Sequence, residues 1–242
     1  MEDFDEAGGI PAVMKRLECA LNKEAITVTG KTVGKNLEQV EEIDSQVIRT
    51  LEDPVSRGGL AVLSGSLAES AVVRPTVIVD EMKRHKGPAR VFDSQEAALD
   101  GLRHGKVKAG DVVVVRFEGP RGGPGLTEVF KVIGFMRGLG LEAKCALVTD
   151  GKISGFARGP FICQVTPEAA EGGPLAVVKD GDMIEMDIFN RKLDLLIPEK
   201  ELKERIRCWK PPAPRVKDGF LTVYARLANP APKGAGINLR ID

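Results

Sequence analysis

Short runs of consecutive apolar residues recur along the middle of the chain, separated by stretches rich in glycine, proline or charge. Two runs, Val112–Val115 and Cys145–Val148, are apolar at every position, which is typical of strands buried on both faces in the centre of a sheet. Other runs predict strands at residues 60–63, 71–73, 89–92, 175–178, 183–188 and 192–197. We expect 175–178 and 183–188 to form a hairpin across the turn at 179–182.

Capping residues and helical spacing predict helices between and around these strands. Asp93 or Ser94 caps a helix that runs from Glu96 to about His104 and stops at Gly105. Further helices are predicted at residues 11–21, 37–51, 126–137 and 198–209, and the tail at 220–227 adds one more segment. Residues 25–29 are short and β-branched.

The N-terminal quarter of the chain differs from the rest. It has apolar faces but too little mass to bury them, as in a piece that packs on something else. The breaker-rich stretch 54–59 is a boundary, so we divide the chain into residues 1–55 and 56–242. We predict a mixed α/β fold: a β-barrel-like core with flanking helices, preceded by a short helical segment.

A glycine-rich loop follows each of the two central strands. Residues 118–125 read E-G-P-R-G-G-P-G, and residues 149–155 read T-D-G-K-I-S-G. A carboxylate such as Glu118 on a loop of this kind suits Mg²⁺, although capping or solvation of Glu118 is favoured from spacing alone. We expect the two loops to form half of an active site whose other half is not on this chain.

Ser154 lies between Gly151 and Gly155 in the second loop. Its alkoxide can act as a base when a nearby cation lowers the hydroxyl pKa, whereas a loop serine more often binds backbone groups. The motif is not G-x-S-x-G, so an α/β-hydrolase elbow is not indicated. A third interpretation is anion binding by the glycine-rich loop before Leu126, with Arg121 and Arg158 pairing with an acid.

Composition excludes several classes of function. The formal net charge is zero and no basic face with aromatic residues is evident, which disfavours nucleic-acid binding. No apolar run is long enough for a membrane helix, and the acidic N-terminus is unlike a secretory signal, so we expect a cytoplasmic protein. The 4 cysteines lack C-x-x-C spacing and there are 2 histidines, so a complete metalloenzyme is not indicated.

Several motifs together carry a family resemblance. They occupy residues 4–14, 27–32, 87–94, 118–125, 149–155 and 167–174, in consistent order over nearly the whole chain. In these motifs the chain resembles the dihydroxyacid dehydratase and phosphogluconate dehydratase family. The resemblance implies a hydro-lyase that converts a 2,3-dihydroxy acid, branched-chain or sugar acid, to a 2-keto acid through an enol.

The resemblance also implies roles for individual residues. Ser154 matches the family's serine base, and Glu118 matches a glutamate that binds Mg²⁺. We assign substrate contacts to four residues of the same two loops: Arg121, Thr149, Asp150 and Gly155. In that family an iron–sulfur cluster binds the C3 hydroxyl that leaves the substrate. A cation near Ser154 would lower the pKa of the serine hydroxyl and so make it a usable base.

In the family, the N-terminal domain holds the cluster cysteines, the remaining Mg²⁺ ligands and a modified lysine. No residues of this sequence match those positions. Residues 1–55 resemble the last helices of that domain, and 56–242 resemble the C-terminal domain of the swivelling β/β/α type. We therefore expect a separate N-terminal half, or a homo-oligomer, as partner. The alternatives are a catalytically incomplete remnant and an acid-binding module.

Departures from the family pattern leave the substrate open. Residues 66–71 read S-L-A-E-S-A where the family usually reads N-L-A-P-E-G, and residues 163–165 read C-Q-V in place of G-H-V. Leu126 replaces the usual methionine. These changes argue against a firm assignment as the branched-chain biosynthetic enzyme, and a sugar-acid dehydratase and a diverged paralogue are the alternatives.

Overall fold

The computed structural model describes residues 1–40, 43–55, 58–155 and 157–237. The chain divides into two compact units, residues 1–58 and residues 59–242. Among the described residues, no helix combines the length and the apolarity that crossing a bilayer requires.

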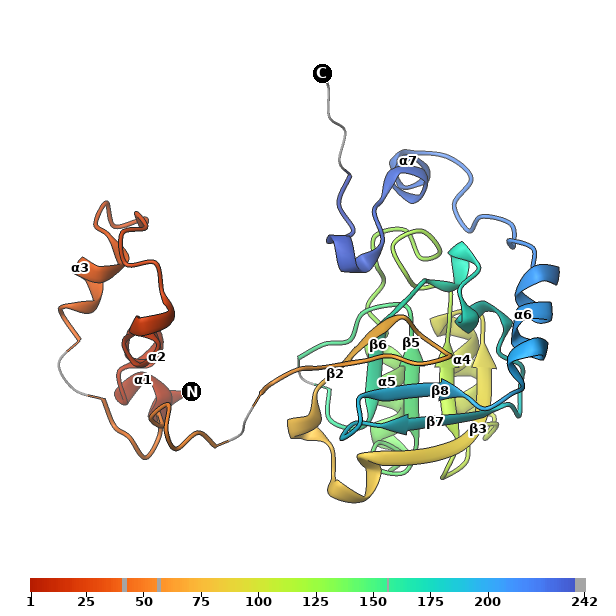
Figure 1. Cartoon of the computed structure of the whole chain (residues 1–242), viewed down its shortest axis with the longest axis horizontal. Coiled ribbons are helices and arrows are strands. Elements are labelled where there is room, and N and C mark those ends of the chain that lie inside the picture. The colour runs from red at the N-terminus through yellow and green to blue at the C-terminus, as the bar shows by residue number, and fades with distance from the viewer. Residues whose placement is uncertain (41–42, 56–57, 156, 238–242) are drawn as a thin grey trace. The chain divides into compact units, whose positions relative to one another are not determined.

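The first unit is a set of short helical pieces (Figure 1, red to orange). They are α1 Glu2–Glu6, α2 Gly9–Arg16, the 3₁₀ turn η1 Glu18–Ala20 and α3 Val33–Leu37. Its small core consists of buried Ala7, Ala12 and Ile48, with Phe4, Val13, Val40 and Ile43 packed around them. Ile26 and Val28 are exposed, and the predicted β-branched segment forms a single bridge between Ile26 and Thr32.

The predicted helix over residues 37–51 is wrong in its described part. Thr32 caps helix α3, which runs from Val33 to Leu37, and turns follow it. Asp44 favours a turn because its Oδ1 accepts the N–H of Gln46, at 2.8 Å, in competition with helical bonding. The apolar positions Val40 and Ile48 therefore reach the core without a continuous helix. Glu41 and Glu42 lie outside the described residues.

An eight-stranded mixed sheet forms the second unit, in the order β1-β2-β6-β5-β4-β3-β7-β8 (Figure 1). The strands are β1 Ala61–Leu63, β2 Ser70–Val73, β3 Arg84–Phe92, β4 Val112–Val115, β5 Ala146–Thr149, β6 Phe161–Thr166, β7 Met183–Asp187 and β8 Lys192–Leu195. Strands β3, β4, β5 and β6 run parallel, and the flanking pairs are antiparallel.

The two outer strands approach each other, so the sheet is nearly closed. The N–H of Ser64, just after β1, donates to the carbonyl of Arg191, at 3.0 Å. The carbonyl of Ser64 accepts the N–H of Leu193 in β8, at 3.1 Å. Closure removes unpaired strand edges. The predicted mixed α/β fold with a barrel-like core and flanking helices is confirmed.

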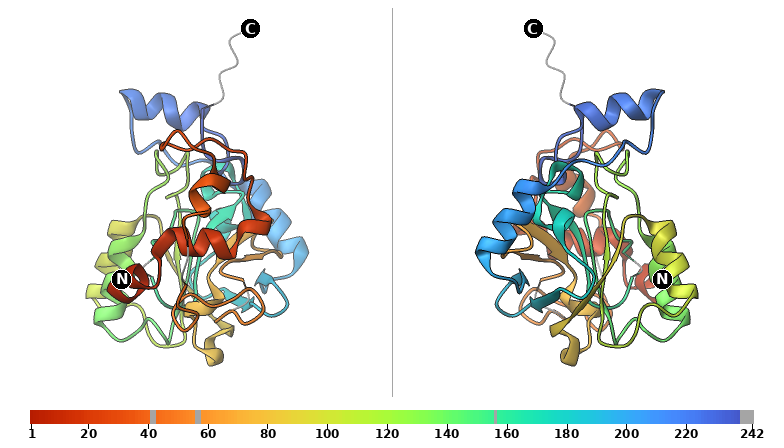
Figure 2. Two further views of the ribbon diagram at one scale, coloured as in Figure 1. Left: turned by 90° about the vertical axis from the view of Figure 1, so that its left-hand side faces the viewer. Right: turned by 90° about the vertical axis from the view of Figure 1, so that its right-hand side faces the viewer.

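The four buried valines of β4 separate two hydrophobic clusters, because successive side chains point to opposite faces of a strand. Val112 and Val114 belong to the interior cluster, and Val113 and Val115 to the cluster under two helices. Those helices are α4 Gln95–Arg103, which Ser94 caps as predicted, and α5 Phe130–Gly138. They lie together on one side of the sheet (Figure 2).

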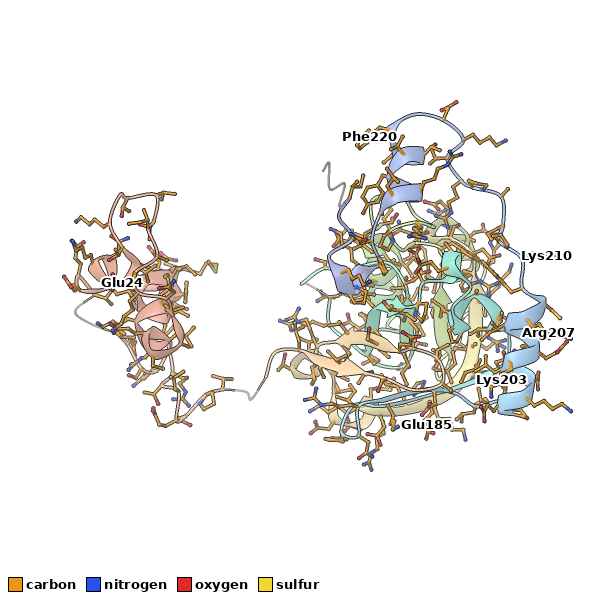
Figure 3. The ribbon with its side chains drawn as sticks, turned by 45° about the horizontal axis from the view of Figure 1, so that its top comes forward. Glu24, Glu185, Lys203, Arg207, Lys210 and Phe220 are labelled. Carbon is orange, nitrogen blue, oxygen red and sulfur yellow. The ribbon has the colours of Figure 1, made fainter. Side chains whose placement is uncertain are left out.

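The remaining helices are α6 Glu199–Cys208 and α7 Phe220–Leu227, both in predicted segments. Helix α6 lies against the 3₁₀ segment η5 Pro174–Val177. Its outer face is charged, and Lys203 and Arg207 point away from the sheet (Figure 3). The other 3₁₀ turns are η2 Pro75–Val77, η3 Asp80–Met82, η4 Ala169–Glu171 and η6 Ala231–Lys233.

Three details of this unit differ from the prediction. Residues 175–178 are no hairpin strand: Pro174 starts the 3₁₀ segment η5, and β7 pairs with β3 and β8 instead. Strand β6 escaped prediction because its six-residue run is interrupted by Gln164, which has a positive φ of 54°. Helix α5 begins at Phe130 rather than Leu126, because Leu126 itself has a positive φ of 60°.

Candidate functional site

The two glycine-rich loops follow neighbouring parallel strands and are bonded to each other. The Asp150 carboxylate accepts the N–H of Glu118 on Oδ1, at 2.9 Å, and the N–H of Phe117 on Oδ2, at 3.1 Å. Farther along, the Lys152 N–H donates to the carbonyl of Thr127 and the Val129 N–H donates to the carbonyl of Lys152, both at 3.0 Å. The structure thus brings the two loops together at one end of the sheet.

Glu118 lies inside this junction with 1% of its surface exposed. Its Oε1 accepts the backbone N–H of Gln95, at 2.7 Å, and a guanidinium N–H of Arg215, at 3.0 Å. Arg215 also donates to the carbonyl of Asp93, at 2.5 Å. Arg215, from the segment after α6, therefore forms an ion pair with the carboxylate that the sequence suggested as a metal ligand.

Thr149 and Asp150 are fully buried. Thr149 Oγ1 accepts the N–H of Gly151, at 3.0 Å, and Asp150 Oδ2 accepts a further N–H from Ala169, at 2.9 Å. Burial raises the pKa of Asp150, partly offset by the three backbone N–H donors. Both side chains hold backbone segments in place, so any effect they have on a substrate is transmitted through the loops.

Ser154 is half-buried and lines a cavity of about 210 Å³. Arg74, Lys152 and Cys163 line the same cavity. Arg74 donates a guanidinium N–H to the carbonyl of Gly155, which is exposed. Two cationic side chains thus share a cavity with the serine, and positive charge favours the ionised form of a nearby hydroxyl.

Arg121 faces a different cavity, of about 510 Å³. Its guanidinium pairs with Glu171, at 3.2 Å, and donates to the carbonyl of Ala228, also at 3.2 Å. Three more cationic side chains line that cavity: Arg215, Lys217 and Arg226. Arg158 is exposed and lines neither the serine cavity nor this one.

Close packing explains Gly122, Gly123 and Gly151. A Cβ on Gly122 would lie 2.9 Å from the Cα of Phe117, and one on Gly123 would lie 2.8 Å from the Cα of Glu118. A Cβ on Gly151 would lie 2.7 Å from the carbonyl oxygen of Thr127. The first loop is folded onto itself and onto the second, and no helix starts at Leu126. The helix N-terminus in the anion-cradle interpretation is therefore not present at that position.

Sequence reasoning missed two residues of this site, Glu168 and Arg215. Glu168 is 4% exposed and accepts the N–H of Arg121, at 3.0 and 3.1 Å, and of Gly122, at 2.9 Å. Its only sequence signal was its position in the P-E-A-A-E-G-G-P stretch at 167–174. Arg215 had none, because it lies 97 positions from Glu118 in a proline-rich tail.

Comparison with known families assigns the chain. Residues 46–235 match the family described as dihydroxy-acid/6-phosphogluconate dehydratase C-terminal. The chain belongs to this family. Residues 1–36 match the corresponding dihydroxy-acid/6-phosphogluconate dehydratase N-terminal description.

Relatives of this dehydratase-family chain include three proteins named dihydroxy-acid dehydratase. The one from Acetivibrio thermocellus is 49% identical over 97% of this chain and 43% of its own length. Those from Methanothrix thermoacetophila and Ignicoccus hospitalis are each 50% identical over 97% of this chain, which covers 44% and 43% of their lengths. The chain spans less than half the length of the relatives it matches.

The described residues fit the family's cofactors only in part. Cys145 is buried, Cys163 half-buried, and Cys19 and Cys208 exposed. Within the described ranges, no three His, Cys, Asp or Glu side chains gather in a way that could hold a metal, so an iron–sulfur cluster does not fit here. For Mg²⁺ the chain offers the Glu118 carboxylate, whose Oε1 accepts N–H groups of Gln95 and Arg215. Mg²⁺ often takes only one or two protein carboxylates, so a role of Glu118 as one such ligand stays a prediction.

Proposed function

We propose that this chain is the C-terminal part of a hydro-lyase that converts a 2,3-dihydroxy acid, branched-chain or sugar acid, to a 2-keto acid. Residues 1–55 are the end of the N-terminal dehydratase domain, and residues 56–242 are the C-terminal swivelling domain. The observation that supports the proposal most is the junction of the E-G-P-R-G-G-P-G and T-D-G-K-I-S-G loops at the ends of β4 and β5.

Ser154 is the proposed base of the reaction. Its alkoxide Oγ takes the proton from C2 of the substrate, the electron pair of that C–H bond forms the C2–C3 double bond, and the C3–O bond breaks with loss of hydroxide. The hydroxide takes up the proton held by Ser154, so that one water is released in total and the alkoxide is restored. The resulting enol becomes the 2-keto acid by proton transfer to C3. Arg74 and Lys152 line the serine's cavity and stabilise negative charge on its oxygen.

Glu118 is the proposed Mg²⁺ ligand on this chain. In this structure its Oε1 accepts a guanidinium N–H of Arg215. Mg²⁺ and an iron–sulfur cluster, bound mainly by the N-terminal domain, would supply Lewis-acid chemistry to the substrate's oxygens. Arg121 and Gly155 contact the substrate in this proposal, whereas the buried Thr149 and Asp150 act on it through the loops they hold.

A specific observation favours an alternative, an acid-binding module without turnover. The cavity of about 510 Å³ has four cationic side chains in its lining and one carboxylate, Asp93. Such a cavity suits a small hydroxy acid. Calorimetry of the chain alone with sugar acids, with and without Mg²⁺, tests this reading. If the chain alone binds sugar acids, and no assembly with an N-terminal part dehydrates them, the result supports an acid-binding module.

The dehydratase proposal is tested by combining this chain with the N-terminal part of the Acetivibrio thermocellus relative. We expect a brown complex that dehydrates a dihydroxy acid, and a Ser154→Ala complex that keeps its cluster and its Mg²⁺ but loses turnover. A complex that forms and carries its cluster yet dehydrates no such acid contradicts the proposal. Failure of Ser154→Ala to assemble assigns the serine a structural role instead.

A further inference from the structure

Two buried carboxylates next to Glu118 are held by backbone groups rather than by cations. Asp150 is 0% and Glu168 4% exposed, and within the described ranges neither forms an ion pair with Lys or Arg. Burial of an ionised carboxylate costs several kcal/mol unless hydrogen bonds offset it. Asp150 and Glu168 also repel each other, so the fold tolerates an unfavourable pair at this place.

The backbone donors to these carboxylates belong largely to one short segment. Asp150 accepts the N–H groups of Phe117 and Glu118, and Glu168 accepts those of Arg121 and Gly122. The segment that presents Glu118 is therefore anchored on both sides of it. The N–H of Ala169 donates to Asp150 as well, which links the residue beside Glu168 to the same group.

The backbone conformation shows why the anchors are needed. Phe117 has a positive φ of 64°, a left-handed conformation that costs a residue with a Cβ roughly 1–2 kcal/mol. Two successive N–H groups at such a position form a concave anion site, and the Asp150 carboxylate fills it. A side chain at Gly119 would collide with Glu168, because a Cβ there would lie 2.5 Å from Glu168 Oε2.

We propose that Asp150 and Glu168 are positioning residues, which fix the place and direction of Glu118 by binding the backbone on either side of it. The catalytic consequence of this positioning rests on the proposed function, in which Glu118 binds Mg²⁺. Amide isosteres are poorer anchors, because all four carboxylate oxygens accept N–H groups and an amide NH₂ would face a donor. Each residue therefore acts through Glu118 and contacts no substrate.

Nuclear magnetic resonance on the full 242-residue chain tests this directly. In Glu168→Gln, we expect the amide signals of Arg121 and Gly122 to shift upfield and to exchange with water about tenfold faster or more. In Asp150→Asn, the amides of Phe117 and Glu118 respond in the same way. Should Asp150→Asn not fold, Glu168→Gln decides alone.

Asp111→Asn is the matched control. Asp111 is also buried, at the opposite end of β4, and accepts the N–H of Lys108, at 2.8 Å. This variant should lose stability and leave the loop amides unchanged. Amides of 121 and 122 that keep their shifts and protection in Glu168→Gln overturn the proposal, as does an equal response to Asp111→Asn.

Assembly with the N-terminal part of the relative extends the test to the reaction. Glu168→Gln should lower kcat and raise the Mg²⁺ concentration at half-maximal activity, with KM for the acid little changed, and Glu168→Asp should restore both in part. A KM effect alone contradicts positioning of a metal ligand. If the wild-type assembly is inactive, the proposed function fails, whereas the amide result still decides the positioning of Glu118.

Discussion

The loops after β4 and β5 begin side by side and are built in opposite ways. The first, at 117–125, turns its key carboxylate inward, where Glu118 is 1% exposed and the N–H groups of Glu118 and Gly122 donate to buried carboxylates. The second, at 149–155, buries Thr149 and Asp150 at its start, and its Ser154 lies half-buried at a cavity beside the exposed Gly155.

This difference matches the two tasks that we propose for Glu118 and Ser154. A metal ligand has to stay in one position, and buried hydrogen bonds to charged groups are strong enough to keep it there. A base that takes a proton has to reach a substrate, so it needs open space next to it. The four predictions below test this contrast, from the largest expected effect to the smallest.

The largest effect is expected for Ser154→Ala in the assembled enzyme. Loss of the base should lower turnover by about 10²- to 10⁴-fold, since that is what a positioned base contributes. The stability of the chain should fall by about 1 kcal/mol or less, because the serine is half-buried. Turnover assays and urea unfolding measure the two quantities.

Ser66→Ala is the control for a structural serine. Ser66 Oγ accepts the N–H of Leu195 in β8, at 2.9 Å, where the two outer strands of the sheet approach each other. Its removal should cost about 1 kcal/mol of unfolding free energy and leave turnover intact. The contrast between the loops breaks down if Ser154→Ala costs stability and spares turnover.

The second prediction concerns pH. Burial, with repulsion from Asp150 and Glu171, raises the pKa of Glu168 from 4.5 to about 7. Between these values the folded chain holds a proton that the unfolded chain has lost. The free energy of unfolding should therefore fall by about 2–3 kcal/mol as pH rises from 4.5 to 7, and Glu168→Gln should flatten the curve.

Urea unfolding at several pH values measures this effect. Below pH 4.5 and above pH 7 the Glu168 contribution is constant, because the carboxyl has the same charge in both states. A wild-type curve that rises with pH across the window, or one that Glu168→Gln leaves unchanged, shows that Glu168 is not the group responsible.

The third prediction compares two glycines of one motif. A Cβ on Gly151 meets the carbonyl oxygen of Thr127 at 2.7 Å and the Cβ of Glu118 at 2.8 Å, so Gly151→Ala should cost about 1–3 kcal/mol. A Cβ on Gly155 meets nothing closer than Arg74, at 4.0 Å, so Gly155→Ala should change stability by less than about 0.5 kcal/mol. Equal costs in thermal unfolding contradict the contrast.

The smallest effect is expected for Arg215→Gln. The arginine side chain is 34% exposed, so loss of its pair with Glu118 should cost about 1 kcal/mol of unfolding free energy. Mg²⁺ should then bind the chain more tightly in calorimetry, because the competing cation is removed. Arg226→Gln, in the same cavity, removes one charge without touching Glu118 and should change Mg²⁺ binding less. Equal effects exclude direct competition.

Elements with a local sequence signal were predicted correctly, whereas elements whose shape depends on tertiary neighbours were not. The all-apolar runs at β4 and β5 and the capped helix α4 have local signals, and they lie where the sequence predicts them. Residues 175–178 have an apolar run suited to a strand, but Pro174 and burial beside α6 make it a 3₁₀ turn. Strand β6 depends on its neighbours β2 and β5 for its shape, so its sequence alone was uninformative.

The N-terminal unit shows the same limit. The apolar positions at 40, 43 and 48 do gather in a small core, as their pattern suggests. Their helix does not form in the described residues, because an aspartate turn competes and a short isolated helix is marginal. Exposed Ile10, Ile26 and Val28 remain outside that core.

By itself the sequence determined the family, the barrel's central strands and the two loops that hold Glu118 and Ser154. Motifs and apolar runs are local, and each can be recognised without its neighbours. Only the tertiary structure decided that Asp150 and Glu168 bind the backbone beside Glu118, and that Arg215 pairs with it from 97 positions away. Such contacts depend on which segments the closed sheet brings together, and no local pattern records that.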